Sequence, residues 1–126
     1  MATLAQPFGP VKPGAHALQA SMLGWHTIGS CTVTANSDYQ FAANGNYNVL
    51  GHSGNFDMAL TLDDRNPAST TGPCTIVNAG QTVRGTYALN GQTMTFTGEG
   101  HTIATSPNGG GVLLAIGGYP NARIAP

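Results

Sequence analysis

Large apolar residues alternate with small or polar ones along most of this chain, which is the pattern of a β-strand with one buried face. The longest unbroken run is FDMALTL, residues 56–62, where every second side chain is large and apolar. The stretch YALNGQTMTFTG, residues 87–98, alternates on both sides of Asn90-Gly91, a dipeptide favoured in two-residue hairpin turns. We therefore expect antiparallel strands joined by short turns.

A further turn is expected at the FAANGNY stretch, where the alternation passes an Asn-Gly pair. Phe41 is predicted to face Tyr47 across a three-residue turn centred on Asn44. Gly45 would then adopt the left-handed conformation of a β-bulge.

Two more registers follow from the same reasoning. Val49 is predicted to face Phe56 across a loop at residues 51–54, and in the Asn-Gly hairpin Tyr87 is predicted to face Met94. Each register gathers the large side chains on one face, which would line the interior of the domain.

Other strands and one helix complete the expected fold. AHALQASML, residues 15–23, is the only stretch rich in helix formers and is expected to form one short helix. We expect an all-β fold, a small antiparallel meander barrel or sandwich of about eight strands. Its remaining strands are expected at residues 25–34, 74–77, 102–105 and 112–116.

The chain has 126 residues, which fits a single domain. Residues 1–14 contain Pro7, Pro10 and Pro13 and are expected to form an extended Pro-rich arm, on the surface or reaching a neighbouring subunit. Residues 15–126 are expected to form the barrel.

Charged residues make up 7% of the chain, against roughly 25% in typical soluble proteins. Four basic residues cannot form the positive surface that binds nucleic acid, and they argue equally against an electrostatic membrane patch. The apolar runs are too short for a spanning helix, so no membrane insertion is expected. The low charge leans towards a secreted or extracellular protein, although the first residues lack the pattern of a signal peptide.

Few residues suggest chemistry. None of the four histidines has a second histidine at metal-ligand spacing, and GHSGN, residues 51–55, differs from the nucleophile motif G-x-S-x-G. No catalytic residue, metal ligand or cofactor is therefore predicted, and an enzyme is less expected than a binding protein. Cys31 and Cys74 either form one disulfide or remain two buried thiols, and both alternatives stay open.

The aromatic and methionine side chains are the candidate ligand-binding residues. Their simplest interpretation is a packed core, but a barrel of about eight strands is just wide enough to hold one small ligand. Buried tyrosine hydroxyls need hydrogen-bond partners, and methionines adapt to irregular shapes. With so little charge available, the ligand would be apolar or neutral. The set comprises Trp25, Tyr39, Phe41, Tyr47, Phe56, Met58, Tyr87, Met94 and Phe96.

Three stretches resemble bacterial lipocalin-like domains, which are small calycin barrels. They are LGW (23–25), FAANGNY (41–47) and GTYALNGQTMTF (85–96), and the resemblance spans residues 23–97. It implies a barrel with an apolar interior and names no ligand. The chain departs from the family pattern because Gly24 directly precedes Trp25, and because no closing C-terminal helix is expected.

The leading functional hypothesis is binding of a neutral or hydrophobic small molecule inside a lipocalin-like barrel. One alternative is a structural or assembly protein, such as an adhesin, a virion component or a secreted oligomer, in which the arm contacts other subunits. Another is a small barrel cyclase or isomerase, with Tyr39, Tyr47 or Tyr87 as the acid.

A carbohydrate-binding module is a further alternative, in which Trp25 and Tyr119 would be exposed contacts. The alternation places Trp25 on the same face as Cys31 and Val33, so we expect Trp25 to be buried. A buried Trp25 would argue against this alternative.

Overall fold

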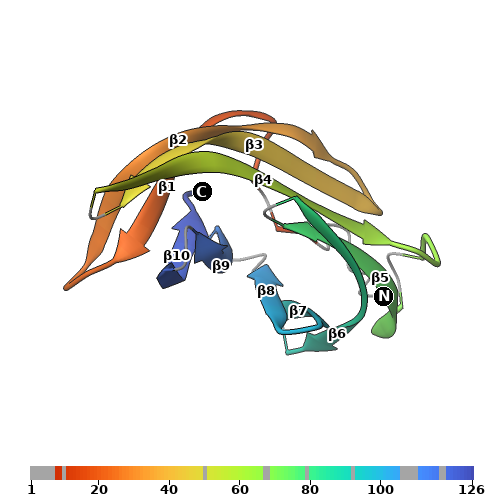
Figure 1. The fold of residues 1–126 in the computed structure, drawn as a ribbon. Coiled ribbons are helices and arrows are strands. Elements are labelled where there is room, and N and C mark those ends of the chain that lie inside the picture. The colour runs from red at the N-terminus through yellow and green to blue at the C-terminus, as the bar shows by residue number, and fades with distance from the viewer. Residues whose placement is uncertain are drawn as a thin grey trace.

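The described part of the chain is built from ten antiparallel strands that close into a barrel, with β1 adjacent to β10 and all other neighbours consecutive (Figure 1). The computed structural model describes residues 8–9, 11–49, 51–66, 69–78, 80–91, 93–105, 111–116 and 119–126. The strands are β1 (Gly14–Ser21), β2 (Trp25–Asn36), β3 (Gln40–Val49), β4 (His52–Leu62), β5 (Thr71–Asn78), β6 (Gln81–Asn90), β7 (Thr93–Gly98), β8 (His101–Thr105), β9 (Val112–Ile116) and β10 (Tyr119–Ile124).

The all-β class, the meander order and the closed barrel are confirmed, with ten strands in place of about eight. The described residues contain no helix, and so none long and apolar enough to cross a membrane. The extended arm was predicted for residues 1–14, but β1 already begins at Gly14, and residues 1–7 and 10 lie outside the described part.

The helix predicted for residues 15–23 is wrong, because residues 14–21 form β1 and no helix follows. Leu18 and Ala20 are buried while their neighbours Ala17 and Gln19 are only partly buried, which is a period of two. The strand pairs on one side with β2 and on the other with β10, closing the barrel. Two hydrogen-bonded neighbours outweigh the modest helix propensity of Ala, Leu and Gln.

The turn predicted at Asn44-Gly45 is also wrong, because β3 runs straight through both residues. Gly45 pairs with Cys31 of β2 and Phe56 of β4. A Cβ atom at Gly45 would lie 2.6 Å from the Cα of Cys31, so β2 and β3 approach each other here more closely than any other residue allows. Glycine marks a close backbone contact at this position, and not a turn.

The following turn is shorter than predicted. Val49 pairs with His52, and Gly51 takes the left-handed conformation at φ 83°. The predicted partner of Val49, Phe56, instead lies opposite Gly45, and His52 and Ser53 belong to β4. Sliding the pairing in this way lengthens both strands and leaves fewer backbone groups unpaired.

The Asn-Gly hairpin exists, with its register moved by two residues. Leu89 faces Met94, and Tyr87 faces Phe96 rather than Met94. Gly91, at φ 65°, forms the turn. Because side chains alternate with a period of two, a shift of two residues keeps the same residues on the inner face.

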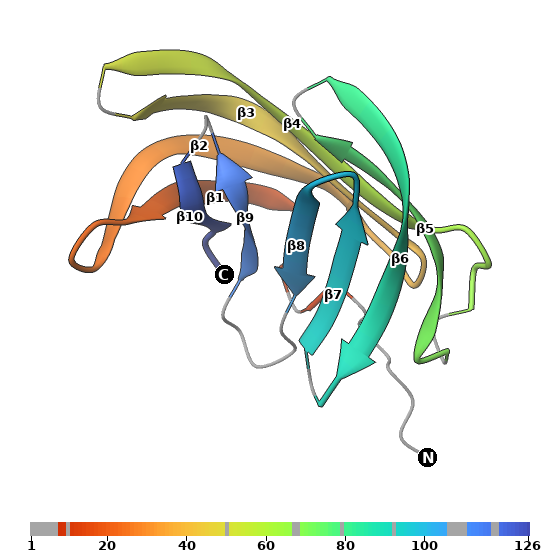
Figure 2. The same ribbon diagram turned by 60° about the horizontal axis from the view of Figure 1, so that its bottom comes forward.

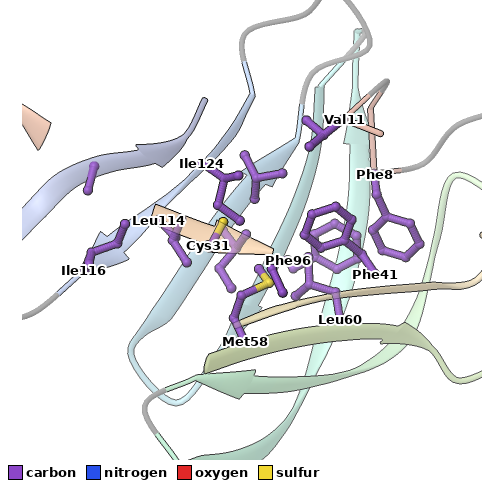
Figure 3. Packing of buried hydrophobic residues seen from close by; sticks show 14 of the residues in the cluster. Phe8, Val11, Cys31, Phe41, Met58, Leu60, Phe96, Leu114, Ile116 and Ile124 are labelled. Carbon is purple, nitrogen blue, oxygen red and sulfur yellow. The ribbon is translucent and has the colours of Figure 1, made fainter. Parts of the chain in front are cut away.

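The inner faces of the strands form one apolar core (Figure 3). Its largest fully buried side chains are Tyr87, Phe8, Phe41, Phe96, Leu18, Met58, Leu60, Leu62, Ile76, Met94, Ile103 and Ile116.

Candidate functional site

Within the described part of the chain, β8 and β9 are the neighbouring strands with the fewest paired residues. These strands share two residue pairs, Ala104 with Leu113 and Thr105 with Val112, whereas β7 and β8 share five. Beyond those pairs β8 and β9 diverge (Figure 2). In the described part of the chain, residues 101–103 have no register partner on the β9 side, so their edge of the sheet is open.

A groove of about 430 Å³ lies where β8 and β9 are poorly paired, bordered by β8, β9, β10 and the β1–β2 hairpin. Its apolar lining includes Trp25 and Leu113, which are 40% and 42% exposed. The buried Leu114 and Ala122 and the partly buried Ala104 complete the apolar part. Two large exposed apolar side chains beside one groove are the kind of surface that marks a binding site.

Polar groups in the groove are few and uncharged. Ser21, Thr102 and Asn121 supply hydroxyl and amide groups, and no ionisable side chain is among the described residues that line it. The groove therefore suits a neutral molecule with a large apolar portion and one or two hydrogen-bonding groups.

Trp25 was expected to be buried, and this prediction is wrong. The pairing of β1 with β2 slips at Leu18–Gln19, which face Gly29 and Thr27, so Ile28 is an extra residue in β2. This bulge brings Ile28 into the core and turns Trp25 to the outside. A bulge depends on the pairing of two strands, so alternation along one strand could not reveal it.

A cation holds the exposed indole in place. The Arg123 guanidinium lies 4.2 Å from the centroid of the Trp25 ring. Arg123 is oriented by its Nε, which donates to the side-chain oxygen of Gln19 at 2.9 Å. Such a cation–π contact restrains the ring and leaves part of its surface open to a ligand.

The other predicted residues lie away from the groove. Tyr39 and Tyr47 are partly buried and pack against the core. The structure brings the remaining six together inside the barrel, namely Phe41, Phe56, Met58, Tyr87, Met94 and Phe96.

A residue that the sequence analysis did not single out packs among these six. Phe8, which precedes β1, is fully buried and stacks on Phe96 with centroids 5.6 Å apart. The Phe8 ring also contacts the Phe41 ring, with the two ring centroids 5.9 Å apart (Figure 3). The Phe8 ring therefore occupies the space beside Phe41 and Phe96 that an interior ligand would need. A large aromatic residue in a Pro-rich stretch was the available signal.

The hydroxyl of Tyr87 is engaged within the protein. It donates to both carboxylate oxygens of Asp64, at 2.8 and 2.9 Å. Burial and this hydrogen bond raise the pKa of Tyr87. Asp63, which precedes Asp64, accepts a hydrogen bond from the hydroxyl of Thr75 at 2.9 Å. These side-chain hydrogen bonds attach the loop after β4 to β5 and β6. Tyr87 is thus placed to hold a loop, and its raised pKa makes it a poor general acid at neutral pH.

Cys31 and Cys74 are free and buried, on β2 and β5, so the two-thiol alternative is the one observed. Burial raises the pKa of each thiol to about 11, with the charge of Asp63 adding to the effect at Cys74. No set of three His, Cys, Asp or Glu side chains within the described residues is arranged to hold a metal ion.

Comparison of the chain with protein-family models, curated proteins and solved structures finds no match.

Proposed function

We propose that this protein binds a neutral, largely apolar small molecule, and that the molecule lies in the groove against Trp25 and Leu113. The proposal rests on the groove of about 430 Å³, which exposes both side chains and has no charged residue among the described residues that line it. Ligand sites for small molecules typically measure about 300–1,000 Å³ and combine apolar walls with a few polar groups.

The proposal keeps the ligand class expected from the sequence and moves its location. The interior position was inferred from aromatic residues that are now seen to pack on one another and on Phe8. The groove offers apolar area that water must leave when a ligand enters. Fully burying an exposed leucine side chain is worth about 1.5–3 kcal/mol, and Leu113, which is 42% exposed, can still gain a little under half of this, so apolar area is the main source of affinity. The lipocalin-like resemblance is consistent with the ligand class and remains part of the proposal.

The test uses the single tryptophan of the chain, which lies in the groove. A panel of neutral apolar and aromatic compounds is titrated while the emission of Trp25 is recorded. Binding in the groove is expected to shift the emission to shorter wavelength, because the indole loses water. Isothermal calorimetry then gives the dissociation constant for the variants.

Leu113→Ser is expected to weaken binding by about tenfold, because the ligand loses an apolar partner. Leu23→Ser is the matched control, since Leu23 is more exposed than any other large apolar residue of the described part and does not line the groove. A ligand that binds Leu113→Ser as tightly as the unchanged protein, with no change in Trp25 emission, would place the site elsewhere.

A neutral carbohydrate is the second candidate ligand. The observation that favours it is the exposed indole beside the hydroxyl and amide groups of Ser21, Thr102 and Asn121, because sugars bind through an aromatic face and several hydrogen bonds. Methyl glycosides belong in the same panel. Asn121→Ala should weaken a sugar and leave a purely apolar ligand unaffected, which separates the two candidates.

A further inference from the structure

The described residues that precede Lys12 make contacts that resemble those of a bound peptide; we call Phe8, Gly9 and Val11 together the arm. The Phe8 ring is fully buried and is stacked on Phe96 of β7 with an interplanar angle of 14°. Its second aromatic neighbour, Phe41, comes from β3. Figure 3 shows the Phe8 ring beside these two rings.

The backbone of the arm is recognised by one side chain. The Nδ2 of Asn36, at the end of β2, donates to the carbonyl oxygen of Gly9 at 3.1 Å and to that of Val11 at 2.7 Å. Val11 is itself buried against the core. The space beside Phe41 and Phe96 and the amide donor of Asn36 together form a specific receptor for a short segment that carries an aromatic ring. We call Phe41, Phe96 and Asn36 together the Phe8 site.

A short exposed connection links the arm to the barrel. Lys12 and Pro13 are exposed, and Gly14 enters β1 with φ 124°, a conformation open to glycine. Beyond this connection, the ring contacts and the Asn36 hydrogen bonds join the arm to elements far along the chain. An identical arm from another molecule would make the same contacts, which is the condition for exchange of a segment between copies.

We infer that the Phe8 site is a peptide-binding site, and that its occupant is the arm of this chain, its own in the monomer and that of a second copy in an arm-exchanged dimer. In the dimer each copy donates one arm and accepts one, so the interface has two-fold symmetry. The inference rests on the Phe8 site and is independent of the groove beside Trp25.

Mass action sets the conditions for exchange. The short connection holds the arm near its own site at an effective concentration on the order of 1 mM. A second copy therefore competes only at high protein concentration, or when the site's own arm has lost its ring. Phe8→Ala in the full chain produces the second situation, since the barrel residues are unchanged and the space beside Phe41 and Phe96 is vacated.

The first experiment measures binding in trans. A fluorescently labelled peptide with the sequence of residues 6–12, QPFGPVK, is titrated with full-length Phe8→Ala protein, and fluorescence polarisation is recorded. The same peptide with alanine in place of phenylalanine is expected to bind about tenfold or more weakly, because it lacks the ring. The unchanged protein, whose site is filled, should also bind the labelled peptide about tenfold or more weakly than the variant.

A second substitution tests the amide. Asn36→Ala added to Phe8→Ala is expected to weaken the peptide severalfold, because two carbonyl groups lose their donor. If Phe8→Ala fails to fold by circular dichroism, the peptide is titrated with the unchanged protein at about 1 mM peptide and above, where it competes with the tethered arm. A folded acceptor that does not bind the peptide would overturn the peptide site.

The second experiment measures exchange in the unchanged protein. Sedimentation is followed from about 10 μM to about 1 mM, where second copies begin to compete with the tethered arm. A dimer whose fraction rises with concentration and disappears in Phe8→Ala supports the inference. Protein that stays monomeric up to about 1 mM, although the peptide binds in trans, would overturn the exchange. Leu113→Ser should change neither experiment, so failure here and failure of the proposed function are distinguishable.

Discussion

Removing the Phe8 ring tests whether the arm is part of the cooperative fold or a segment docked onto a barrel that is already complete. Phe8 and Phe96 are both fully buried rings, and they stack on each other. Contact geometry alone would assign them similar importance. Their covalent context differs, because Phe96 lies within β7 between two paired strands, while Phe8 precedes the first strand.

The two positions should therefore respond differently to alanine. Phe96→Ala leaves a cavity that fixed strands cannot close, and such changes lower the free energy of unfolding by about 3–5 kcal/mol. Phe8→Ala lets the arm detach, so the loss cannot exceed the free energy of docking. Burial of one phenylalanine is worth about 1.5–3 kcal/mol, and ordering the arm backbone opposes it, so we expect a loss of about 1–2 kcal/mol.

Urea unfolding followed by circular dichroism measures both losses, at protein concentrations low enough to avoid arm exchange. In the double variant, Phe96→Ala should cost less than it does alone, because the contact with Phe8 is already gone. The reasoning is refuted if Phe8→Ala costs as much as Phe96→Ala, or if the two losses simply add.

Three further outcomes are expected. Gly45→Ala should lower the free energy of unfolding by about 1–3 kcal/mol in urea titrations, because a Cβ there would collide with the backbone of β2; an unchanged midpoint would contradict this contact. Tyr87→Phe should lower the free energy of unfolding by about 1 kcal/mol, since the hydrogen bond is lost while the exposed Asp64 regains water. Asp64→Asn should lower it less, because the asparagine keeps an acceptor for the Tyr87 hydroxyl; a loss in thermal stability only for Asp64→Asn would contradict the assigned hydrogen bond. Cys31 and Cys74 should resist a thiol reagent at pH 8 until the protein unfolds. Because folding raises the pKa of both thiols from 9.0 to about 11, their contribution to stability is complete below pH 9 and should fall as the pH rises from 9 to 11; stability that rises over this interval would be inconsistent with buried thiols.

The candidate site was predictable only in part. Six of the nine candidate residues do share one interior, because the inner face of each strand can be read from its own alternation. Trp25 lines the groove and stays a candidate contact, but its expected position inside the barrel was wrong. The groove itself needs Leu113 of β9 and the hairpin of β1 and β2 to lie side by side, and no local pattern indicates this neighbourhood.

By itself, the sequence determined the all-β class, the meander order and the inner faces of strands such as residues 56–62, because a period of two is a property of each strand alone. Only the tertiary structure decided that residues 14–21 form a strand, that Gly45 marks a close approach, that a bulge turns Trp25 outward and that Phe8 enters the barrel. Each of these features depends on a partner far along the chain. The energy of pairing and packing with such partners exceeds the local preferences of about 1 kcal/mol per residue that a sequence pattern reports.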